Sequence, residues 1–437
     1  MNFLYYLASR PFLLVSAFLG LLVAIFLAAW SALPQPPKTL TIATGFPEGL
    51  YSQFAKQLQI ELAKEKISLE IRNTGGSVEN LALINNPQSG VDLAIVQSGI
   101  GNAQQYPDLV SLAGLFYEPL WVWYRQAAFA KEGGVLSQLS QLQGKRVSIG
   151  NEGSGTQLLT EMILGHNQLD FSKGGLLEKL NPYEATQKLE RGELDVVFIV
   201  VASEAALLQK FYQIPGIRLM DFDQAEAYSR LMPFLKRVDI PRGLISIAHD
   251  LPKNDIRVLA STAVLVGKKD INPATVSVLL GSSYDILRNY TRLQKAGDFP
   301  TAQGLDFPID LDAEIFLRDG PSFFYRHLPF WGAVWVERFI KILIPLLIIL
   351  LPIFTYLPAA VSFSLKIKLA VFYKILKTIE KRYQTNGQTP EILDQINELE
   401  RRIERLNISA LQSKEVYDLK SHVAFVREKI QASQSIN

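Results

Sequence analysis

Two long runs without charged residues stand out in the hydrophobic pattern of this chain. Residues 11–37 and 342–365 contain no Asp, Glu, Lys or Arg, and residues 12–33 are almost all apolar. A helix over residues 12–33 would be about 33 Å long, enough to cross the hydrocarbon core of a bilayer. The pattern therefore predicts two transmembrane helices, the second of them kinked at its prolines.

The first run is open to two interpretations, a retained anchor or a secretory signal. Ala29, Trp30 and Ser31 offer small residues at a possible cleavage site. The apolar run is longer than the roughly 7–15 residues of an ordinary signal peptide. Its length favours a transmembrane anchor or an uncleaved signal over residues 1–33.

Between the two runs, short strand-like segments alternate with helical patterns. This order is typical of a parallel sheet covered by helices. Strands are expected near residues 40–43, 67–72, 91–96, 111–124, 145–149, 194–200, 216–221 and 258–267. Helices are expected near residues 50–64, 77–85, 135–141, 156–165, 182–191, 203–211 and 272–290.

The C-terminal residues carry two apolar seams with the three- and four-residue spacing of a coiled coil. The seams are Ile392, Ile396, Leu399, Ile403 and Leu406, followed by Val416, Leu419, Val423, Val426 and Ile430. A helix start at Thr389 and Pro390 and the short break between the seams predict an antiparallel helical hairpin. Two heptads are short for an isolated coiled coil, so the hairpin must pack on itself or on a partner helix.

Basic residues beside the second run set the expected orientation. Residues 366–382 contain six Lys or Arg side chains and a single acid, Glu380. The positive-inside rule places the C-terminus in the cytoplasm and, with two spans, the N-terminus as well. Residues 34–340 are then expected outside the cytoplasm. The aromatic residues in 321–340 are expected at the interface between the lipid bilayer and water.

Composition excludes several kinds of chemistry. The formal net charge is only +2 over 437 residues, which gives no argument for nucleic-acid binding. There is no cysteine, and the four histidines lie too far apart for a metal site on a helix. Neither a P-loop nor a G-x-S-x-G nucleophile motif is present. We therefore expect no catalytic residue, no cofactor and no metal.

Three loops that contain glycine connect a predicted strand to a predicted helix. They are TGFPEG (44–49), TGGSVENL (74–81) and GNEGSGT (150–156). Glycine permits a tight turn that leaves backbone N–H groups uncovered, and a helix N-terminus attracts negative charge. Because parallel strands end at one edge of a sheet, these loops predict a ligand crevice at that edge.

Four segments give the chain a resemblance to a known family. TGGSVENL (74–81), DLAIVQS (92–98), LFYEPL (115–120) and GKRVSIG (144–150) resemble segments of TAXI-type solute-binding proteins. Those proteins serve tripartite ATP-independent periplasmic (TRAP) transporters. The resemblance covers roughly residues 38–270. It implies an α/β, two-lobe periplasmic-binding-protein-like fold of type II.

The resemblance also implies partners and a location. The expected solute is a small carboxylate or an amino acid, for example a glutamate-like one, and the expected protein partner is a TRAP-type membrane permease. The expected location is the bacterial cytoplasmic (inner) membrane, with the main domain periplasmic and the C-terminus cytoplasmic. Together with the two spans, this gives a division of the chain. It comprises an anchor (1–33), lobe 1 (34–125 and 240–320), lobe 2 (126–239), an interfacial segment (321–340), a second transmembrane helix (341–365) and a cytoplasmic hairpin (366–437).

Candidate ligand-binding residues follow from the loops and from the strand ends. They are Thr44, Gly45, Tyr51, Gly76, Ser77, Asn80, Gln97, Ser98, Ser154, Gly155, Thr156, Ala202, Ser203 and Arg242. The guanidinium fork of Arg242 suits a carboxylate, but a surface arginine at a crossing between lobes is the plainer interpretation. Glu48 stands where relatives usually carry glycine, so it would repel a carboxylate or attract an ammonium group.

Three functions remain open at this stage. The first is capture of a solute for a TRAP-type transporter. The second is a membrane-bound ligand sensor that signals through the cytoplasmic helical hairpin. The third is an interaction scaffold with a degenerate binding cleft. Two membrane anchors suit a sensor better than they would suit a freely diffusing binding protein.

Overall fold

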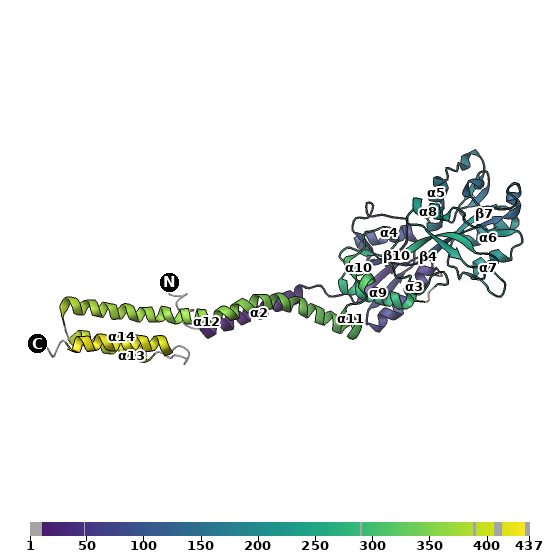
Figure 1. Cartoon of the computed structure of the whole chain (residues 1–437). Coiled ribbons are helices and arrows are strands. Elements are labelled where there is room, and N and C mark those ends of the chain that lie inside the picture. The colour runs from purple at the N-terminus through teal and green to yellow at the C-terminus, as the bar shows by residue number, and fades with distance from the viewer. Residues whose placement is uncertain (1–10, 48, 289–290, 388–389, 406–412, 433–437) are drawn as a thin grey trace. The chain divides into compact units, whose positions relative to one another are not determined.

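The structure is a computed structural model that describes residues 11–47, 49–288, 291–387, 390–405 and 413–432 (Figure 1). Thr389 and Leu406, which belong to the predicted hairpin, lie outside the described residues. The chain divides into two compact units. One is Pro34–Val336, and the other joins Met1–Leu33 to Glu337–Asn437. The two units are treated separately below.

The first half of the sheet in Pro34–Val336, lobe 1, has the strand order β2-β1-β3-β10-β4. Its strands are β1 (Thr39–Ala43), β2 (Ser68–Arg72), β3 (Leu93–Gln97), β4 (Leu109–Arg125) and β10 (Ile256–Lys268). The helices α3 (Leu50–Lys64), α4 (Ser77–Asn85) and α9 (Pro273–Leu287) belong to this lobe. β1, β2 and β3 are parallel, whereas β10 is antiparallel to both β3 and β4.

The second half, lobe 2, repeats this plan with the order β6-β5-β7-β4, and β8 pairs with the far side of β4. Its strands are β5 (Arg146–Ser148), β6 (Leu176–Glu178), β7 (Val196–Val200) and β8 (Ile217–Leu219). Its helices are α5 (Gly155–His166), α6 (Pro182–Arg191), α7 (Ala206–Gln213) and α8 (Ala225–Leu231). Each lobe therefore adds a crossing strand to three parallel strands, which is a two-lobe α/β fold.

β4 and β10 run through both lobes. β4 pairs with β10 along most of its length and then, from Leu120 to Tyr124, with β7 of lobe 2. β10 pairs with β9 (Lys236–Ile240) at its start and with β3 of lobe 1 at its end. The register of β10 against β4 shifts between Ala263 and Val264. Both connections between the lobes are thus continuous strands.

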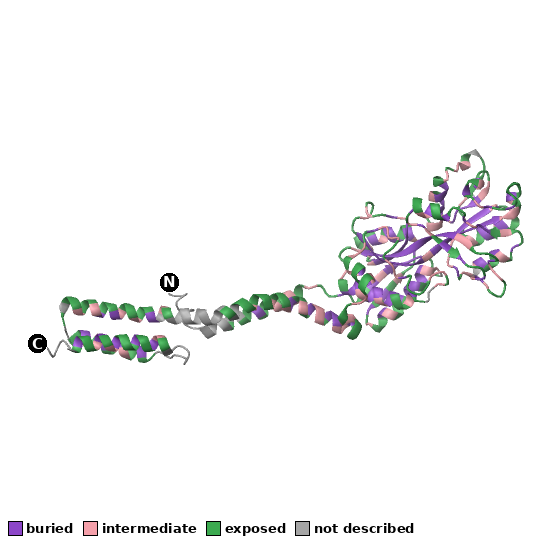
Figure 2. Cartoon of the chain, in the orientation of Figure 1, coloured by how far each residue is buried: buried purple, intermediate pink, exposed green. Residues whose placement is uncertain are grey.

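Each lobe has its own hydrophobic core, and the central strands β3, β4, β7 and β10 are buried along most of their length (Figure 2). In lobe 1, Phe54 of α3 packs on Phe116 of β4. In lobe 2, Trp123 of β4 stacks on Phe211 with ring centroids 4.9 Å apart. The long apolar pattern of β4 is explained by burial on both faces, which is typical of a central strand.

The last residues of the first unit pack on lobe 1. They include the helices α10 (Leu311–Asp319) and α11 (Phe323–His327). Phe330 is buried in the core of lobe 1, and the indole N–H of Trp331 donates to the carbonyl of Glu65 at 2.8 Å. Part of the aromatic segment 321–340 therefore belongs to the core of lobe 1.

The second unit is helical. It contains α2 (Pro11–Ala32), most of α12 (Phe330–Asn386), α13 (Pro390–Glu404) and α14 (Ser413–Ala432). α13 and α14 share one apolar core with Leu369, Leu376 and Ile379 of α12. The seams of the predicted hairpin thus pack against a third helix as well as against each other. The guanidinium of Arg338 donates to the carbonyls of Trp30 and Leu33 at 2.6 and 2.8 Å.

Among the described residues, no helix is both long and apolar enough to cross a membrane.

Several elements differ from the sequence-based expectations. The helix expected at 135–141 is replaced by a short 3-10 turn, η3 (Leu139–Leu142), because Gln138 is extended and its backbone N–H donates to the Gln141 side chain. β6, β9, α8 and α10 were not predicted. Further 3-10 turns are η1 (Pro87–Ser89), η2 (Gln126–Glu132) and η4 (Phe171–Lys173). Pro345, Pro352 and Pro358 do not interrupt α12.

Candidate functional site

The carboxyl ends of the lobe 1 strands gather several candidate residues at one edge. β4 is parallel to β3, because both are antiparallel to β10. Gln97 at the end of β3 and Phe116 of β4 both pair with Ala263 of β10, so Glu118 lies just beyond the level of Gln97. This is the edge at which open α/β sheets bind ligands.

The carboxyl ends of the lobe 2 strands lie at the same part of β4, near Glu118. Leu120 of β4 pairs with Val200 at the end of β7, and the strands are antiparallel. Extending that register by two residues brings Ala202 level with Glu118. The backbone N–H of Val200 donates to Oγ1 of Thr156 at 3.2 Å, which ties the first turn of α5 to β7. Both edges therefore converge where β4 passes from one lobe to the other.

A buried chain of polar side chains ends on Glu118. The backbone N–H of Gln97 donates to Oγ of Ser77 at 2.9 Å, and Ser77 also acts on the pKa of Tyr51, in the direction opposite to burial. The Tyr51 hydroxyl donates to Oε2 of Glu118 at 2.7 Å. Burial raises the pKa of Glu118 to about 7, although the bond from Tyr51 acts in the opposite direction. Burial also raises the pKa of Tyr51, so its hydroxyl stays protonated.

The two lobes touch beside this chain. A Cβ placed on Gly155 of α5 would collide with Oε1 of Gln97 and would lie 3.0 Å from its Cδ. The hydroxyl of Ser98 donates to the carbonyl of Phe234 at 3.2 Å, and Gly99 packs on the Phe234 ring. The absence of a side chain at Gly155 is therefore what lets α5 approach β3 so closely.

Two buried polar atoms at this junction lack a hydrogen-bond partner within the described part of the chain. They are Nε2 of Gln97, on lobe 1, and Oγ of Ser203, on lobe 2. The two residues are only 3 % and 5 % exposed. Each unsatisfied buried polar atom of this kind costs about 1–3 kcal/mol.

The side chains of four predicted residues form hydrogen bonds that hold the fold together. Asn80 donates to the carbonyls of Thr44 and Ile95 and accepts from Thr74, so its amide is fully used. The hydroxyl of Thr44 bonds the carbonyl of Arg72 at 3.3 Å. Ser154 is the N-cap of α5. Ser98 also accepts from the N–H of Thr262 at 2.8 Å and so fixes the end of β3 to β10.

Two predicted glycines lie near the ends of β1 and β2. Gly76 is the N-cap of α4 with φ +124°, a conformation that only glycine adopts readily. The space next to its Cα is open. Gly45 lies beside the ring of Tyr51, and a Cβ there would be 3.7 Å from it. Gly76 therefore leaves the backbone beside Ser77 uncovered, whereas Gly45 is buried.

Arg242 stands apart from the buried chain of polar side chains. Its guanidinium binds both carboxylate oxygens of Asp250, at 2.6 and 2.7 Å, and the arginine side chain is 64 % exposed. Hydrogen bonding to Asp250 raises the pKa of Arg242. The guanidinium fork of Arg242 is thus bonded to a surface carboxylate.

Glu118 was not among the predicted site residues. Its signal is visible in the sequence, because it is the one ionisable carboxyl in the apolar segment that forms β4. A charge in the middle of a buried strand requires a partner or a function. Its importance depends on Tyr51 and Ser77 lying next to it, which spacing alone does not reveal.

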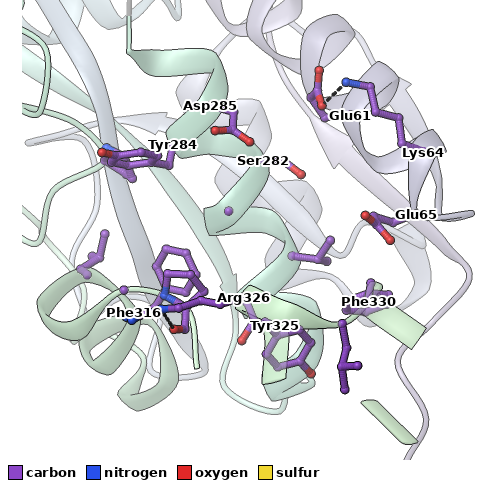
Figure 3. Close-up of a pocket in the computed structure, with 18 of the residues that line it drawn as sticks. Glu61, Lys64, Glu65, Ser282, Tyr284, Asp285, Phe316, Tyr325, Arg326 and Phe330 are labelled. Atoms are coloured by element: carbon purple, nitrogen blue, oxygen red, sulfur yellow. Dashed lines mark hydrogen bonds and ion pairs between the residues drawn. The ribbon is translucent and has the colours of Figure 1, made fainter. Parts of the chain in front are cut away.

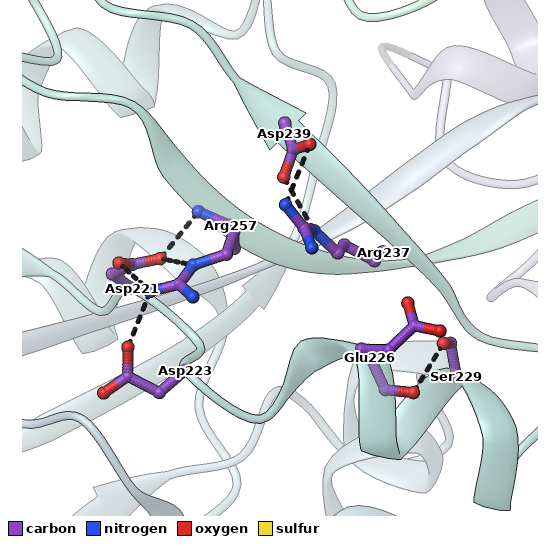
Figure 4. A network of polar contacts seen from close by, with 7 residues as sticks. All are labelled: Asp221, Asp223, Glu226, Ser229, Arg237, Asp239 and Arg257. Atoms are coloured by element: carbon purple, nitrogen blue, oxygen red, sulfur yellow. Dashed lines mark hydrogen bonds and ion pairs between the residues drawn. The ribbon is translucent and has the colours of Figure 1, made fainter.

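Other features of the first unit lie away from this junction. A pocket of about 670 Å³ opens between α3, α9 and the α10–α11 segment (Figure 3). On lobe 2, Arg257 of β10 binds Asp221 and Asp223 (Figure 4). Burial opposes ionisation of Asp221, but the bonds from Arg257 hold its pKa below the usual value. No acid or histidine cluster suited to a metal ion occurs among the described residues.

Solved structures with a similar chain path include the periplasmic aliphatic sulphonate binding protein SsuA from Escherichia coli. It is 16 % identical with a TM-score of 0.37, and the match covers 57 % of this chain and 70 % of SsuA. A TctC solute binding protein from Polaromonas is 14 % identical with a TM-score of 0.37, over 59 % and 87 % of the two chains.

A search of curated proteins finds no match. The family model described as NMT1-like, in contrast, matches residues 42–304, which is more than half of the chain and includes both lobes. The chain belongs to the NMT1-like family.

Proposed function

We propose that this protein captures a small solute between its two lobes. The observation that carries the proposal is the junction at Glu118, where the carboxyl ends of both half-sheets meet. Gln97, on lobe 1, and Ser203, on lobe 2, each carry a buried polar atom that has no partner among the described residues. Small-molecule sites commonly combine such polar groups with a largely preformed apolar frame.

The finer part of the proposal concerns delivery and solute class. We infer a TAXI-type binding protein that passes its solute to a TRAP-type permease, with a carboxylate or amino-acid-like compound as the solute. Four sequence segments support this inference, and three of them contribute Ser77, Gln97 and Glu118 to the junction.

The first test is ligand-induced stabilisation of the full-length chain purified in detergent. Organic acids and amino acids are screened by thermal shift, and co-purified compounds are identified by native mass spectrometry. A ligand at a hundred times its Kd should add about 2.7 kcal/mol to the free energy of unfolding. If no compound raises the Tm and none co-purifies, the capture function is wrong and the degenerate scaffold becomes the better proposal.

We also propose that the chain is anchored in the cytoplasmic membrane, with its two-lobe unit in the periplasm and its C-terminus in the cytoplasm. Support comes from the uncharged runs at 11–37 and 342–365 and from the basic residues in 366–382. In this arrangement the first unit meets solutes outside the cell, while α13 and α14 meet cytoplasmic proteins.

Topology can be tested with single cysteines, because the chain has none of its own. Tyr183 on lobe 2 and Tyr417 on α14 form a matched pair, since each is 72 % exposed. An impermeant maleimide added to cells with a permeabilised outer membrane should label Tyr183→Cys and leave Tyr417→Cys unmodified until the cells are lysed. Equal labelling of both cysteines before lysis would contradict the proposed arrangement.

A ligand sensor is the second candidate function. α12 favours it, because this one helix contributes Phe330 to the core of lobe 1 and Leu376 and Ile379 to the core of α13 and α14. A change in lobe 1 on solute binding would thereby have a covalent helical route to the C-terminal helices. A neighbouring permease gene would favour transport, and a neighbouring signalling gene would favour sensing.

A further inference from the structure

Lobe 1 has a carboxyl group of its own, that of Glu118, beside the position proposed for the solute. We propose that the solute turns a positively charged nitrogen, rather than a carboxylate, toward lobe 1, and that Glu118 is the residue that accepts it. The inference rests on the proposed capture of a solute between the lobes. It reverses the expectation that Ser77 and the start of α4 hold a solute carboxylate.

Glu118 has unused capacity to accept a hydrogen bond. Its Oε2 accepts from Tyr51, whereas Oε1 has no hydrogen-bond partner among the described residues. The residue is 8 % exposed, and Oε1 is not among the fully enclosed atoms that lack a partner. An atom of a small solute can therefore reach Oε1 from the junction.

The surroundings of Glu118 supply no positive charge. The side chain that bonds its carboxyl group, Tyr51 of α3, is neutral, and so is Ser261 of β10, whose hydroxyl donates to the Glu118 backbone carbonyl at 3.4 Å. No cationic side chain of the described residues acts on its pKa. A solute carboxylate placed here would add a second negative charge to a buried site. A cationic nitrogen would instead supply the missing counter-charge and donate to Oε1.

Lobe 2 offers the opposite kind of contact. The backbone N–H groups of Gly155 and Thr156 begin α5 and have no acceptor among the described residues, as expected for a first helical turn. Ser203, whose hydroxyl is enclosed and has no partner among the described residues, follows the neighbouring strand β7 by three residues. The two N–H groups suit an oxygen or a carboxylate of the solute. The solute is thus oriented with its nitrogen on lobe 1 and its acceptor group on lobe 2.

The test uses matched pairs of compounds that differ mainly in the amine. The pairs are L-glutamate and glutarate, 4-aminobutyrate and butyrate, L-alanine and propionate, and 1,4-diaminobutane and 1,4-butanediol. Binding to the full-length protein in detergent is measured by titration calorimetry for the wild type, Glu118→Gln and Glu118→Asp. Glu70→Gln, on the exposed face of β2, is the control for the change in net charge.

The expected result is that at least one amine binds and its amine-free partner does not. Its affinity should fall at least about tenfold in Glu118→Gln, as for loss of a hydrogen bond to a charged group. The fall should be smaller in Glu118→Asp and absent in Glu70→Gln. Because the Gln variant has the same shape, a Tm no lower than that of the wild type would exclude misfolding as the cause.

Two outcomes would overturn the inference, and they differ in what they say of the proposed function. If amine-free anions bind the wild type, and bind Glu118→Gln equally or more tightly, Glu118 is not the acceptor although solute capture stands. If no compound of the set and no co-purified compound binds the wild type or either variant, solute capture itself is wrong.

Discussion

Replacing Glu118 with glutamine should change how the stability of the protein depends on pH. Burial raises the pKa of Glu118 to about 7, compared with 4.5 for an exposed glutamate. Between pH 4.5 and pH 7, Glu118 is therefore protonated in the native state and ionised in the unfolded chain. Native stability from this group is complete below pH 4.5 and is lost as the pH rises through 7. The shift corresponds to about 3 kcal/mol.

The measurement is the free energy of unfolding of the wild type and Glu118→Gln from denaturant titrations at pH 4.5 and at pH 8. The free energy of unfolding of the variant, relative to that of the wild type, should rise by about 3 kcal/mol from pH 4.5 to pH 8, because glutamine does not ionise. Glu70→Gln, which changes an exposed acid of β2, should show no comparable gain. A Glu118→Gln difference that is the same at both pH values would mean that Glu118 is not a buried, proton-binding group.

Valine at position 155 should weaken solute binding by preventing close contact between the lobes. A Cβ at this position collides with Oε1 of Gln97, whose side chain is only 3 % exposed and has little room to move. Overpacking of this kind typically costs about 1–3 kcal/mol, which is roughly 5- to 150-fold in affinity if closure accompanies binding. Affinity for a ligand found in the solute screen is the quantity to compare.

Gly165→Val is the matched control, because Gly165 lies on the same helix and has open space where a Cβ would be. It should leave the affinity unchanged. Equal affinities in Gly155→Val and Gly165→Val would show that this contact plays no part in binding.

Much of the two-lobe architecture can be predicted from hydrophobic periodicity. The segment that became β4 has a long apolar pattern because it is buried on both faces, and α6 begins with an Asn-Pro pair that caps it well. The short strands β6 and β9 escape such an analysis. β6 is only three residues long, and β9 alternates charged and apolar residues beside a proline-rich loop.

The site was harder to predict because its residues come together only in the folded sheet. Ser77, Gln97 and Tyr51 were expected from the loops, yet the partner that links them, Glu118, lies in a different strand. Asn80 has the side chain of a ligand-binding residue, but it is buried where it joins β1 to β3. Sequence spacing shows which residues stand near a strand end, whereas burial and hydrogen bonding decide which of them remain available.

The passage of β4 and β10 through both lobes limits how the lobes can be exchanged between related proteins during evolution. Lobe 2 is inserted in the sequence of lobe 1, yet it contains no complete sheet without the end of β4 and the start of β10. Recombination that exchanged residues 126–239 between two relatives would therefore have to preserve the pairing of both strands at once. The lobes of such a protein evolve as a pair, and a new specificity arises more readily by point substitution along their shared edge than by exchange of a whole lobe.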